Sequence, residues 1–440
     1  MLECIVTKFG GSSLANDEQF RKVRSILELE PTRRYLVPSA PGKRFPKDEK
    51  VTDLLYLCHS LAKEGKPFET EFAKIRERYL DIARGLHLKV DIGAALKEVE
   101  DGIASGKGPD WCASRGEYLC AMLMADYLGW RFLDAAEGIV FTEDGILDDE
   151  KTQQKLSALL ADGKSTVVPG FYGAKESGEV HTFSRGGSDI TGALVARAVN
   201  ADVYENWTDV SGFLMADPRI INSPAEISSI TYKELRELSH MGASVLHEDA
   251  MFPVHRAGIP TNIRNTNKPY HPGTMISKNA PHEVSVPTIT GIAGHRGYSV
   301  ISVEKNMMNS EVGFGRKVLQ VLEDADISFE HMPTGIDSMC VVVNSETLAP
   351  HRDEVIAKIE KLVEGSGSVS LSDHMAIIAT VGRGMVHNCG TAARLFSAMS
   401  RARINVRMID QGSSELSIIV GVNDNDFEAT IHAIYHEFVE

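Results

Sequence analysis

Features typical of secreted, membrane-spanning and zinc-binding proteins are missing from this sequence. The six cysteines are scattered and include no Cys-x-x-Cys pair, which indicates free thiols in a reducing compartment rather than a disulfide or zinc framework. No stretch approaches the roughly 18 uninterrupted apolar residues that a membrane helix needs. The first residues lack a basic segment followed by a long apolar run, so we expect no signal peptide and a cytoplasmic location.

Positive charge is also in short supply. The net charge is −15 at pH 7, whereas nucleic-acid-binding proteins usually present a basic face. This balance does not exclude a nucleotide as ligand, because a nucleotide site needs only local positive charge. No set of residues predicts a resident metal. A length of 440 residues with 43% hydrophobic and 24% charged residues is ordinary for a globular protein of two or three domains.

Strand and helix patterns alternate through the first part of the chain. Short apolar runs indicate strands, and apolar residues at helical spacing indicate the helices between them. This alternation predicts an α/β fold with a largely parallel sheet between helical layers. The expected strands are Glu3–Lys8, Arg34–Ala40, Arg131–Ala135, Thr166–Gly170, Asp202–Asn206 and Pro260–Asn265. The expected helices are Phe68–Arg84, Val90–Ser105, Ile190–Asn200, Tyr232–His240 and Val245–Ala257, with two more opened by Val51 and by Ala113.

Two glycine turns stand between a strand and a helix. The first, Phe9-Gly10-Gly11-Ser12-Ser13, follows the strand that ends at Lys8, and since the lysine precedes the glycines this is not a Walker A loop. The second, Phe183-Ser184-Arg185-Gly186-Gly187-Ser188-Asp189, places two glycines directly before a helix, which its last two residues can cap. Glycines let backbone N–H groups approach an anion, and a helix N-terminus favours negative charge.

Polar residues gather in the loop after the expected strand Asp202–Asn206. They are Thr208, Asp209, Asp217 and Arg219. Open α/β sheets bind their ligands at the carboxyl ends of the strands, so this loop is a candidate ligand site. Asp-Pro-Arg is also a good turn sequence, and a purely structural role for the last two residues stays open.

Over nearly its full length the chain resembles the aspartate kinases, members of the amino-acid kinase superfamily. The resemblance rests on the turn after Lys8, on Val180–Ile221, and on Val381–Met385 and Gln411–Glu415 near the C-terminus. It implies transfer of a phosphoryl group from ATP to the side-chain carboxylate of L-aspartate, giving ADP and 4-phospho-L-aspartate. This is the first step of the lysine, threonine and methionine branch. ATP and Mg²⁺ are the implied cofactors.

The resemblance assigns roles to individual residues. Lys8 contacts the transferred phosphoryl group, and Asp189 orients Lys8 and the substrate ammonium, with helix N-capping as the alternative for Asp189. Glu117 holds the substrate ammonium and Arg185 grips a carboxylate through two parallel hydrogen bonds, as arginine can. Ser39 and Thr52 border the amino-acid substrate. The implied nucleotide-binding residues are Lys8, Gly10, Gly11, Ser12, Gly187, Ser188, Thr208, Asp209, Asp217 and Arg219.

Several positions depart from the pattern of the aspartate kinases. Ser12 replaces a usual threonine and Ser184 a glycine, while Leu214 and Met215 stand where relatives often carry tyrosine and a small hydroxyl residue. Ser244 replaces a lysine, which removes one nucleotide contact. The Pro- and Lys-rich connection Pro41–Lys50 looks longer than in some relatives and is expected to be mobile. These departures concern nucleotide affinity more than reaction type.

The C-terminal part looks like two copies of a βαββαβ unit, similar to paired ACT domains. We expect a catalytic domain over residues 1–280, a first ACT domain over 288–365 and a second over 366–440. In relatives the first unit is inserted within the second, so Thr288–Val303 is a candidate for pairing into the second unit's sheet. The first copy is expected at Tyr298–Val303, Phe314–Ala325, Ile327–His331, Met339–Val343 and Arg352–Val363. The second is expected at Met375–Val381, Asn388–Ala402, Val406–Ile409, Glu415–Val420 and Asn425–Phe438.

The paired ACT-like units imply regulation by an amino acid and assembly of the chain into a homodimer or a dimer of dimers. By resemblance the effector pocket is lined by Met308, Gly313, Phe314, Glu330 and Asp337. An acidic residue such as Glu330 or Asp337 suits the cationic side chain of lysine better than threonine, so lysine is the expected effector.

Two other functions remain in view. The chain could be a kinase for glutamate, acetylglutamate or a nucleotide monophosphate, against which Glu117 and the ACT-like tail count. It could also be a non-catalytic amino-acid sensor, against which the intact Lys8 and Asp189 count. A bifunctional kinase–homoserine dehydrogenase is not expected, because no dinucleotide-binding pattern follows the second ACT-like unit.

Overall fold

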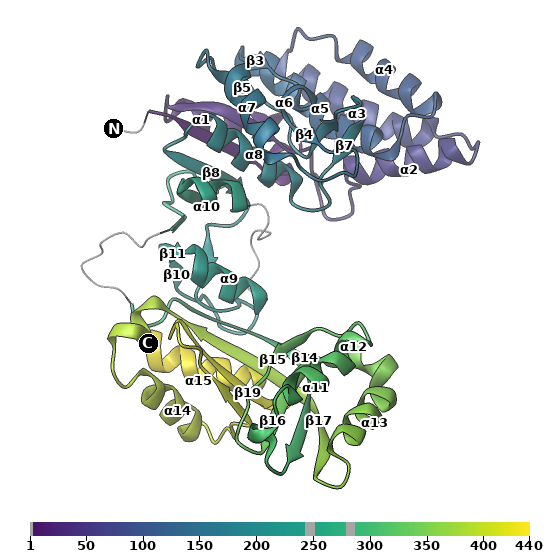
Figure 1. Ribbon diagram of the computed structural model, residues 1–440. Coiled ribbons are helices and arrows are strands. Elements are labelled where there is room, and N and C mark those ends of the chain that lie inside the picture. Colours follow the sequence, from purple (N-terminus) through teal and green to yellow (C-terminus); the bar gives the residue numbers. More distant parts are fainter. Residues whose placement is uncertain (1–2, 243–250, 279–286) are drawn as a thin grey trace. The chain divides into compact units, whose positions relative to one another are not determined.

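The computed structural model describes residues 3–242, 251–278 and 287–440, and the chain divides into two compact units. The first unit contains Met1–Phe213, Ser228–Tyr232 and Val245–Pro281; the second contains Leu214–Ile227, Lys233–Ser244 and His282–Glu440. Figure 1 labels many of the elements of both. Ser244, the start of the helix expected at Val245–Ala257 and most of the stretch Pro281–Pro287 between the expected domains lie outside the described residues. None of the helices in the described ranges is long and apolar enough to cross a membrane.

Within the described residues, the first unit is built on a sheet of eight strands in the order β11-β13-β12-β8-β1-β2-β5-β3. Its strands are β1 (Ile5–Phe9), β2 (Arg33–Pro38), β3 (Arg131–Phe132), β5 (Thr166–Val167), β8 (Val203–Thr208), β11 (Ser229–Thr231), β12 (Thr261–Asn265) and β13 (Thr274–Ser277). The pair β12–β13 is antiparallel, and the central pairs β1–β2 and β1–β8 are parallel. The predicted α/β class with a largely parallel sheet is confirmed.

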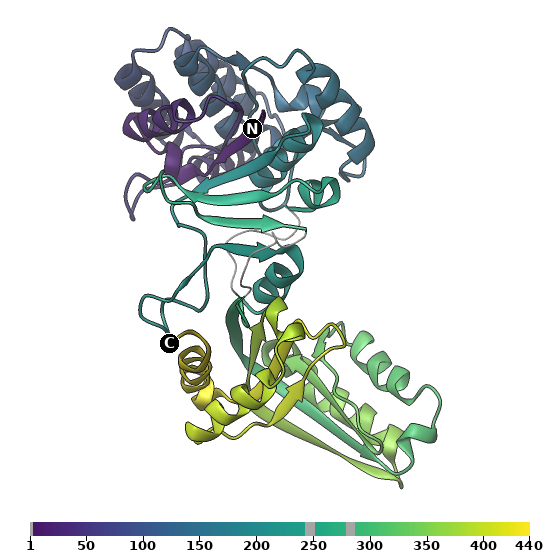
Figure 2. The same cartoon turned by 90° about the vertical axis from the view of Figure 1, so that its left-hand side faces the viewer.

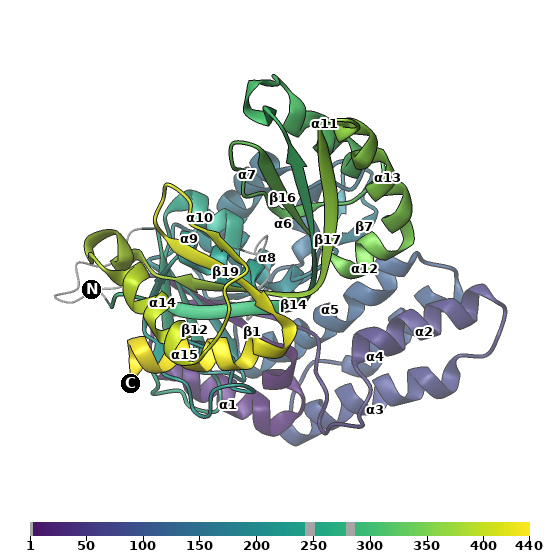
Figure 3. The ribbon, with the colours of Figure 1, turned by 90° about the horizontal axis from the view of Figure 1, so that it is seen from below.

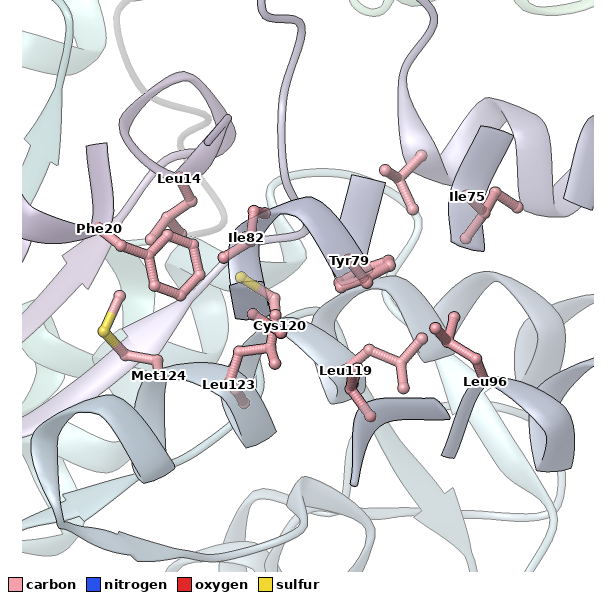
Figure 4. Packing of buried hydrophobic residues seen from close by; sticks show 14 of the residues in the cluster. Leu14, Phe20, Ile75, Tyr79, Ile82, Leu96, Leu119, Cys120, Leu123 and Met124 are labelled. Atoms are coloured by element: carbon pink, nitrogen blue, oxygen red, sulfur yellow. The ribbon is translucent and has the colours of Figure 1, made fainter. Parts of the chain in front are cut away.

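Helices cover both faces of this sheet (Figure 2). One face packs against α1 (Asp17–Glu28), α2 (Val51–Lys63), α3 (Glu69–Leu86), α4 (Ile92–Ala104) and α5 (Pro109–Leu128). The other packs against α6 (Ala135–Gly138), α7 (Asp149–Leu160), α8 (Gly187–Ala198) and α10 (Phe252–Ala257). Figure 4 shows the first of these two cores, where Tyr79 of α3 lies among Leu96, Leu119 and Cys120 of α4 and α5. A small sheet, β4 (Val140–Phe141), β6 (Tyr172–Lys175) and β7 (Val180–Thr182), precedes α8.

Side-chain alternation along the central strands decides which face carries the chemistry. In β1, Phe9 enters the core of α1–α5 while Val6 enters the core beneath α8. Lys8 is two residues from Val6 and therefore shares the α8 face. In β8, Tyr204 and hence Asn206 share that face as well.

In the described part of the second unit, an antiparallel sheet of six strands has the order β15-β16-β14-β17-β19-β18. Its strands are β14 (Gly291–Lys305), β15 (Phe329–His331), β16 (Ser338–Asn344), β17 (Gly367–Val381), β18 (Met408–Asp410) and β19 (Ser417–Asn423). Its longer helices are α11 (Phe314–Glu323), α13 (Arg352–Val363), α14 (Thr391–Arg401) and α15 (Phe427–Val439), with α12 (Ser345–Leu348) between β16 and α13. Figure 3 shows α11 and α13 beside one half of this sheet and α14 and α15 beside the other.

The strands β14 and β17 belong to both halves of the second sheet. Gly291–His295 pairs with Ile377–Val381 in the half that contains β19. In the other half, Tyr298–Glu304 pairs with β16 and Val300–Lys305 pairs with Gly367–Ser372. The expectation that the segment from Thr288 enters the sheet of the second ACT-like unit is therefore confirmed for Gly291–His295. Each half thus takes one of its strands from an extension of a strand of the other.

Two earlier segments of the chain complete the second unit. The segment Leu214–Ile227, which includes β10 (Glu226–Ile227) and the end of β9 (Phe213–Leu214), buries Ala216 and Ile221 in the core beneath α14 and α15. The helix α9 (Tyr232–His240) inserts Glu234, which is fully buried. The carboxylate of Glu234 accepts hydrogen bonds from the Thr290 hydroxyl at 2.6 Å and from the backbone and guanidinium of Arg383 at 3.0 and 2.9 Å.

Candidate functional site

Lys8 and Asp189 form an ion pair near the carboxyl ends of the central strands. Lys8 Nζ lies 2.6 Å from Asp189 Oδ1, and Asn206 Nδ2 donates to the same oxygen at 2.7 Å. Lys8 and Asn206 are register partners in β1 and β8, so both side chains reach the first turn of α8 from the same face. The ammonium of Lys8 is thus held in one position beside a helix N-terminus, where the helix dipole favours an anion.

The start of α8 differs from the sequence prediction. Gly186 is the N-cap, with φ +58°, and no side chain caps the helix. The prediction that Ser188 or Asp189 caps α8 is wrong, because both lie inside the first turn. The conformation of Gly186 is left-handed and favours glycine. Gly187 is needed for space, since a Cβ there would lie 2.7 Å from the Phe171 ring. Because Asp189 does not cap the helix, its carboxylate is available to bind Lys8 and Asn206.

The glycines after β1 have unequal roles. The N–H of Gly10 donates to the carbonyl of Trp207 at 3.0 Å, so in the described arrangement this amide is engaged with the neighbouring strand. Gly11 instead passes against the loop after β2: a Cβ on Gly11 would lie 2.7 Å from Ala40 O, and one on Gly42 would lie 2.6 Å from Gly11 C. The N–H of Gly42 donates to Gly11 O at 2.8 Å. Glycine at both positions lets the two loops cross backbone to backbone.

Glu117 is a buried carboxylate with an unused oxygen. It lies in the third turn of α5, which begins at Pro109, so the prediction of a helix starting at Ala113 with Glu117 in its first turn is wrong. Glu117 is 5% exposed, and its Oε2 has no hydrogen-bond partner within the described part of the chain. Burial raises the pKa of Glu117 to about 8, although a hydrogen bond from the Ala40 backbone opposes the rise. Such a group gains from a cation placed beside it.

Two of the other predicted substrate residues, Ser39 and Thr52, are next in the chain to residues that pack on α5 beside Glu117, whereas Arg185 lies in a separate loop. A Cβ on Gly116 would lie 2.9 Å from Ala40 Cβ and 3.6 Å from Val51 Cγ1, so α5 packs closely on the end of β2 and the start of α2. Ser39 and Thr52 are the chain neighbours of Ala40 and Val51 and are both half-buried. Arg185 is exposed in the loop between β7 and α8.

The connection Pro41–Lys50, expected to be mobile, is tied to α3 in the structure. Arg78 Nη2 lies 2.6 Å from Asp48 Oδ2, and Arg78 Nη1 donates to Gly42 O at 2.7 Å. Arg44 also bonds Asp48, and these guanidinium groups hold the pKa of the Asp48 carboxyl well below its ordinary value. The sequence pattern gave no sign of this anchor, because Asp48 and Arg78 lie 30 residues apart.

The predicted nucleotide residues fall into both units. Ser12 is exposed, Ser188 is buried against Gly170, and Thr208 Oγ1 donates to the exposed Asp209 at 3.2 Å. Asp217 and Arg219 belong to the second unit, and their side chains are paired at 2.6 Å. Hydrogen bonds from Arg219 lower the pKa of Asp217. The Asp-Pro-Arg turn anticipated from the sequence is therefore present in this loop.

The five predicted effector residues have different environments. Met308 and Phe314 are buried in the core of the half-sheet that contains β16, and Gly313 is the N-cap of α11 with φ +82°. Glu330 pairs with His240 Nε2 at 2.9 Å. Asp337 is exposed and is the one of these five described residues that lines an open hollow of about 520 Å³, together with Lys305, Asn306, Ser366 and neighbouring residues.

Sequence reasoning missed Asn206, Gly42 and Trp207. The signal for Asn206 was its place on the strand beside the one that carries Lys8. Trp207 stacks on Phe9, with ring centroids 5.7 Å apart, and its indole N–H donates to buried Glu205 at 2.8 Å. Glu205 in turn receives two hydrogen bonds from Arg33. These contacts of Phe9, Trp207, Glu205 and Arg33 hold the strand that carries Lys8 against its two neighbours, β8 and β2.

Comparison with known proteins assigns both parts of the chain to families. Residues 3–265 match the amino acid kinase family, and residues 378–438 match an ACT domain. The chain is 39% identical to aspartokinase 3 of Bacillus subtilis over 457 aligned residues, covering 98% of each protein.

Solved structures show the same similarity. The structure of Clostridium acetobutylicum aspartate kinase matches with 50% identity and a TM-score of 0.91, covering 99% of this chain and 100% of the other. Aspartokinase III of E. coli matches with TM-scores of 0.71 for its complex with aspartate and ADP and 0.74 for its complex with lysine and aspartate. The identities are 23% and 22%, with full coverage of both chains, so this second likeness shows the fold alone.

Proposed function

The chain belongs to the amino acid kinase family, as an aspartate kinase with a C-terminal ACT domain, and we propose that Lys8, Asp189, Glu117 and Arg185 carry its substrate chemistry. The observation that supports this assignment best is Glu117, a buried carboxylate with one unpaired oxygen and a pKa of about 8. Burying such a carboxylate in its charged form costs free energy unless a cation pairs with it. The ammonium group of aspartate is that cation.

The reaction joins two anions, and the proposed residues act by bringing them together. The aspartate side chain is already ionised at pH 7 and needs no general base. Its oxygen attacks the γ-phosphorus of ATP, a new O–P bond forms, and the bond from that phosphorus to the β-γ bridging oxygen breaks, so the electron pair leaves with ADP. Lys8 neutralises the transferred group, and Asp189 holds Lys8 in place at 2.6 Å.

Arg185 completes substrate binding. It is exposed and free of the core, and a guanidinium binds a carboxylate through two parallel hydrogen bonds. Together with Glu117 it matches the carboxylate and ammonium of an α-amino acid. Ser39 and Thr52 border this position.

The nucleotide enters as a complex with Mg²⁺, which shields its phosphates from the attacking carboxylate. We assign its contacts in the first unit to the amides of Gly11 and Gly187 and to the residues Ser12, Ser188, Thr208 and Asp209; for Asp217 and Arg219 of the second unit, a nucleotide role stays a prediction from resemblance. Aspartokinase III of E. coli, which has the same fold, was solved in complex with aspartate and ADP. For Arg219 to meet a phosphate, its pair with Asp217 must open.

Lysine is the proposed effector, and its binding at the ACT-like half-sheet that contains β16 makes the enzyme a regulated first step of the lysine branch. Asp337 is exposed beside the hollow of about 520 Å³, and its negative charge suits a cationic side chain. The E. coli protein was crystallised with lysine. A homodimer or a dimer of dimers through these domains is part of the same proposal.

The test is trapping of the acyl phosphate with hydroxylamine in the presence of ATP, Mg²⁺ and L-aspartate, with and without lysine. We expect aspartyl hydroxamate in the wild type, a loss of about a hundredfold or more in Lys8→Ala, and normal rates in Lys22→Ala, which removes an exposed lysine of α1. Hydroxamate that lysine does not suppress would keep the kinase and reopen the effector, with threonine next. Hydroxamate from glutamate but not aspartate would favour another amino-acid kinase. Unchanged turnover in Lys8→Ala would favour an amino-acid sensor.

A further inference from the structure

A clasp outside the proposed contact residues joins β7 to the start of α5. Asp110, in the first turn of α5, accepts a hydrogen bond from the backbone N–H of Thr182 at 3.1 Å. The same carboxylate oxygen lies 2.7 Å from Nδ1 of His181. One acidic side chain therefore holds two consecutive residues of β7.

His181 is partly buried and also contacts Phe141 and the turn at Gly145. Its ring packs edge-on against Phe141, with centroids 4.9 Å apart. A Cβ on Gly145 would lie 2.8 Å from His181 Nε2, and Gly145 has φ +80°, so glycine makes room for the imidazole there. The imidazole thus has a fixed orientation towards Asp110.

The clasp lies on the same side of α5 as Glu117. Seven residues separate Asp110 from Glu117, which is close to two helical turns and about 10 Å along the axis. Burial raises the pKa of Tyr56 of α2, and the nearby charges of Asp110 and Glu117 add to the rise. A single helix face therefore carries the proposed ammonium site at one end and the anchor of β7 at the other.

The strand β7 leads directly into the loop that carries Arg185, three residues beyond Thr182. At its far end this loop is fixed by Gly186 and by the first turn of α8. At its near end, β7 is held by its pairing with β6, by the N–H of buried Phe183 on Phe171 O at 3.0 Å, and by the clasp to Asp110 of α5. Only two residues separate the end of β7 from Arg185. A shift of β7 along α5 therefore moves Arg185 relative to Glu117.

We propose that Asp110 is a positioning residue that sets the span between Arg185 and Glu117 and thereby the affinity for the amino-acid substrate; the inference rests on the roles proposed for those two residues. Asp110 touches neither substrate nor nucleotide. Loss of Asp110 should change the affinity for aspartate and not the affinity for ATP, since the part of the site around Lys8 is built on other strands.

The experiment measures KM for aspartate and KM for ATP separately in Asp110→Ala. We expect KM for aspartate to rise about tenfold, the loss for one charge-assisted hydrogen bond, with KM for ATP within twofold of the wild type. Asp110→Asn keeps an oxygen for the Thr182 N–H and loses the charge facing His181, so its KM for aspartate should lie between the two. It also serves as the folding-safe variant.

Asp162→Ala is the matched control. Asp162 pairs with Arg131 at 3.3 Å, is exposed to a similar degree as Asp110, and lies in the turn before β5, away from β7. It should leave both KM values unchanged. An unchanged KM for aspartate in Asp110→Ala, or a parallel rise of both KM values, would overturn the inference. A wild-type enzyme that makes no aspartyl hydroxamate would instead overturn the proposed function, so the two failures are distinguishable.

Discussion

Glu117 is a carboxyl group whose burial disfavours its charged form. In its proposed role, the ammonium group of aspartate offsets this cost. In the protein without substrate, its carboxyl is neutral over much of the physiological range because burial raises its pKa to about 8. A neutral carboxyl attracts an ammonium group far less than a carboxylate does. In the proposed role of Glu117, substrate binding is therefore coupled to loss of a proton.

The first prediction concerns the pH dependence of aspartate binding. Below pH 8 the Glu117 carboxyl must lose its proton before it can hold the substrate ammonium, so KM for aspartate should fall by about tenfold or more as the pH rises from 6.5 to 8.5. Glu117→Gln should raise this KM and remove its pH dependence, while KM for ATP stays the same. Steady-state kinetics at saturating MgATP provide the measurement. A wild-type KM for aspartate that is flat across this range would contradict the assignment of Glu117.

At the scale of elements, the crossing of the loops after β1 and β2 is set by glycine at two positions. Added methyl groups at Gly11 or Gly42 would meet backbone atoms at 2.7 and 2.6 Å, and backbone cannot move aside as a flexible side chain can. At Gly10 the nearest atoms to such a methyl group lie at 3.7 Å, and the residue has an ordinary φ of −71°.

We therefore predict that Gly11→Ala and Gly42→Ala each destabilise the first unit by about 1–3 kcal/mol, whereas Gly10→Ala does not. Thermal unfolding followed by circular dichroism would measure the difference. Equal melting temperatures for Gly10→Ala and Gly42→Ala would show that the two loops do not cross as described.

The elements show how far local pattern can go. Helices with clear apolar spacing were located from the sequence, and α9 and α13 have the predicted bounds Tyr232–His240 and Arg352–Val363. The start of α5 was misplaced because its buried residues face several sides and do not form one stripe. The anchors of the candidate site, such as Arg78 on Asp48 and Asn206 on Asp189, join distant parts of the chain. Residue spacing does not reveal such contacts, and the resemblance named only residues expected to touch substrate, nucleotide or effector.

At the scale of the whole molecule, the second unit has two cores but one sheet. One core contains Leu395 of α14, and the other contains Ile359 of α13. Because β14 and β17 run through both halves, neither half can lose its strands without exposing the other.

We predict that the two halves unfold together. Leu395→Ala and Ile359→Ala should each cost about 2–4 kcal/mol, the usual cost of truncating a fully buried side chain. Each should speed amide hydrogen exchange in β16 and in β19 alike. Val312→Ala, at a fully exposed position, should change neither strand. Faster exchange confined to the half that carries the substitution would contradict the prediction.

The sharing of β14 and β17 also limits how this region can be recombined with that of a relative. A crossover placed between the two ACT-like repeats would join a strand begun in one parent to a partner strand from the other, so both hybrid repeats would inherit mismatched edges. Exchange of effector specificity between relatives should therefore fail when one repeat is transferred alone, and should require the segment from Gly291 onward to be transferred whole together with Leu214–Ile227 and α9, which belong to the same unit. The two repeats are separate in sequence but must be exchanged as one structural unit.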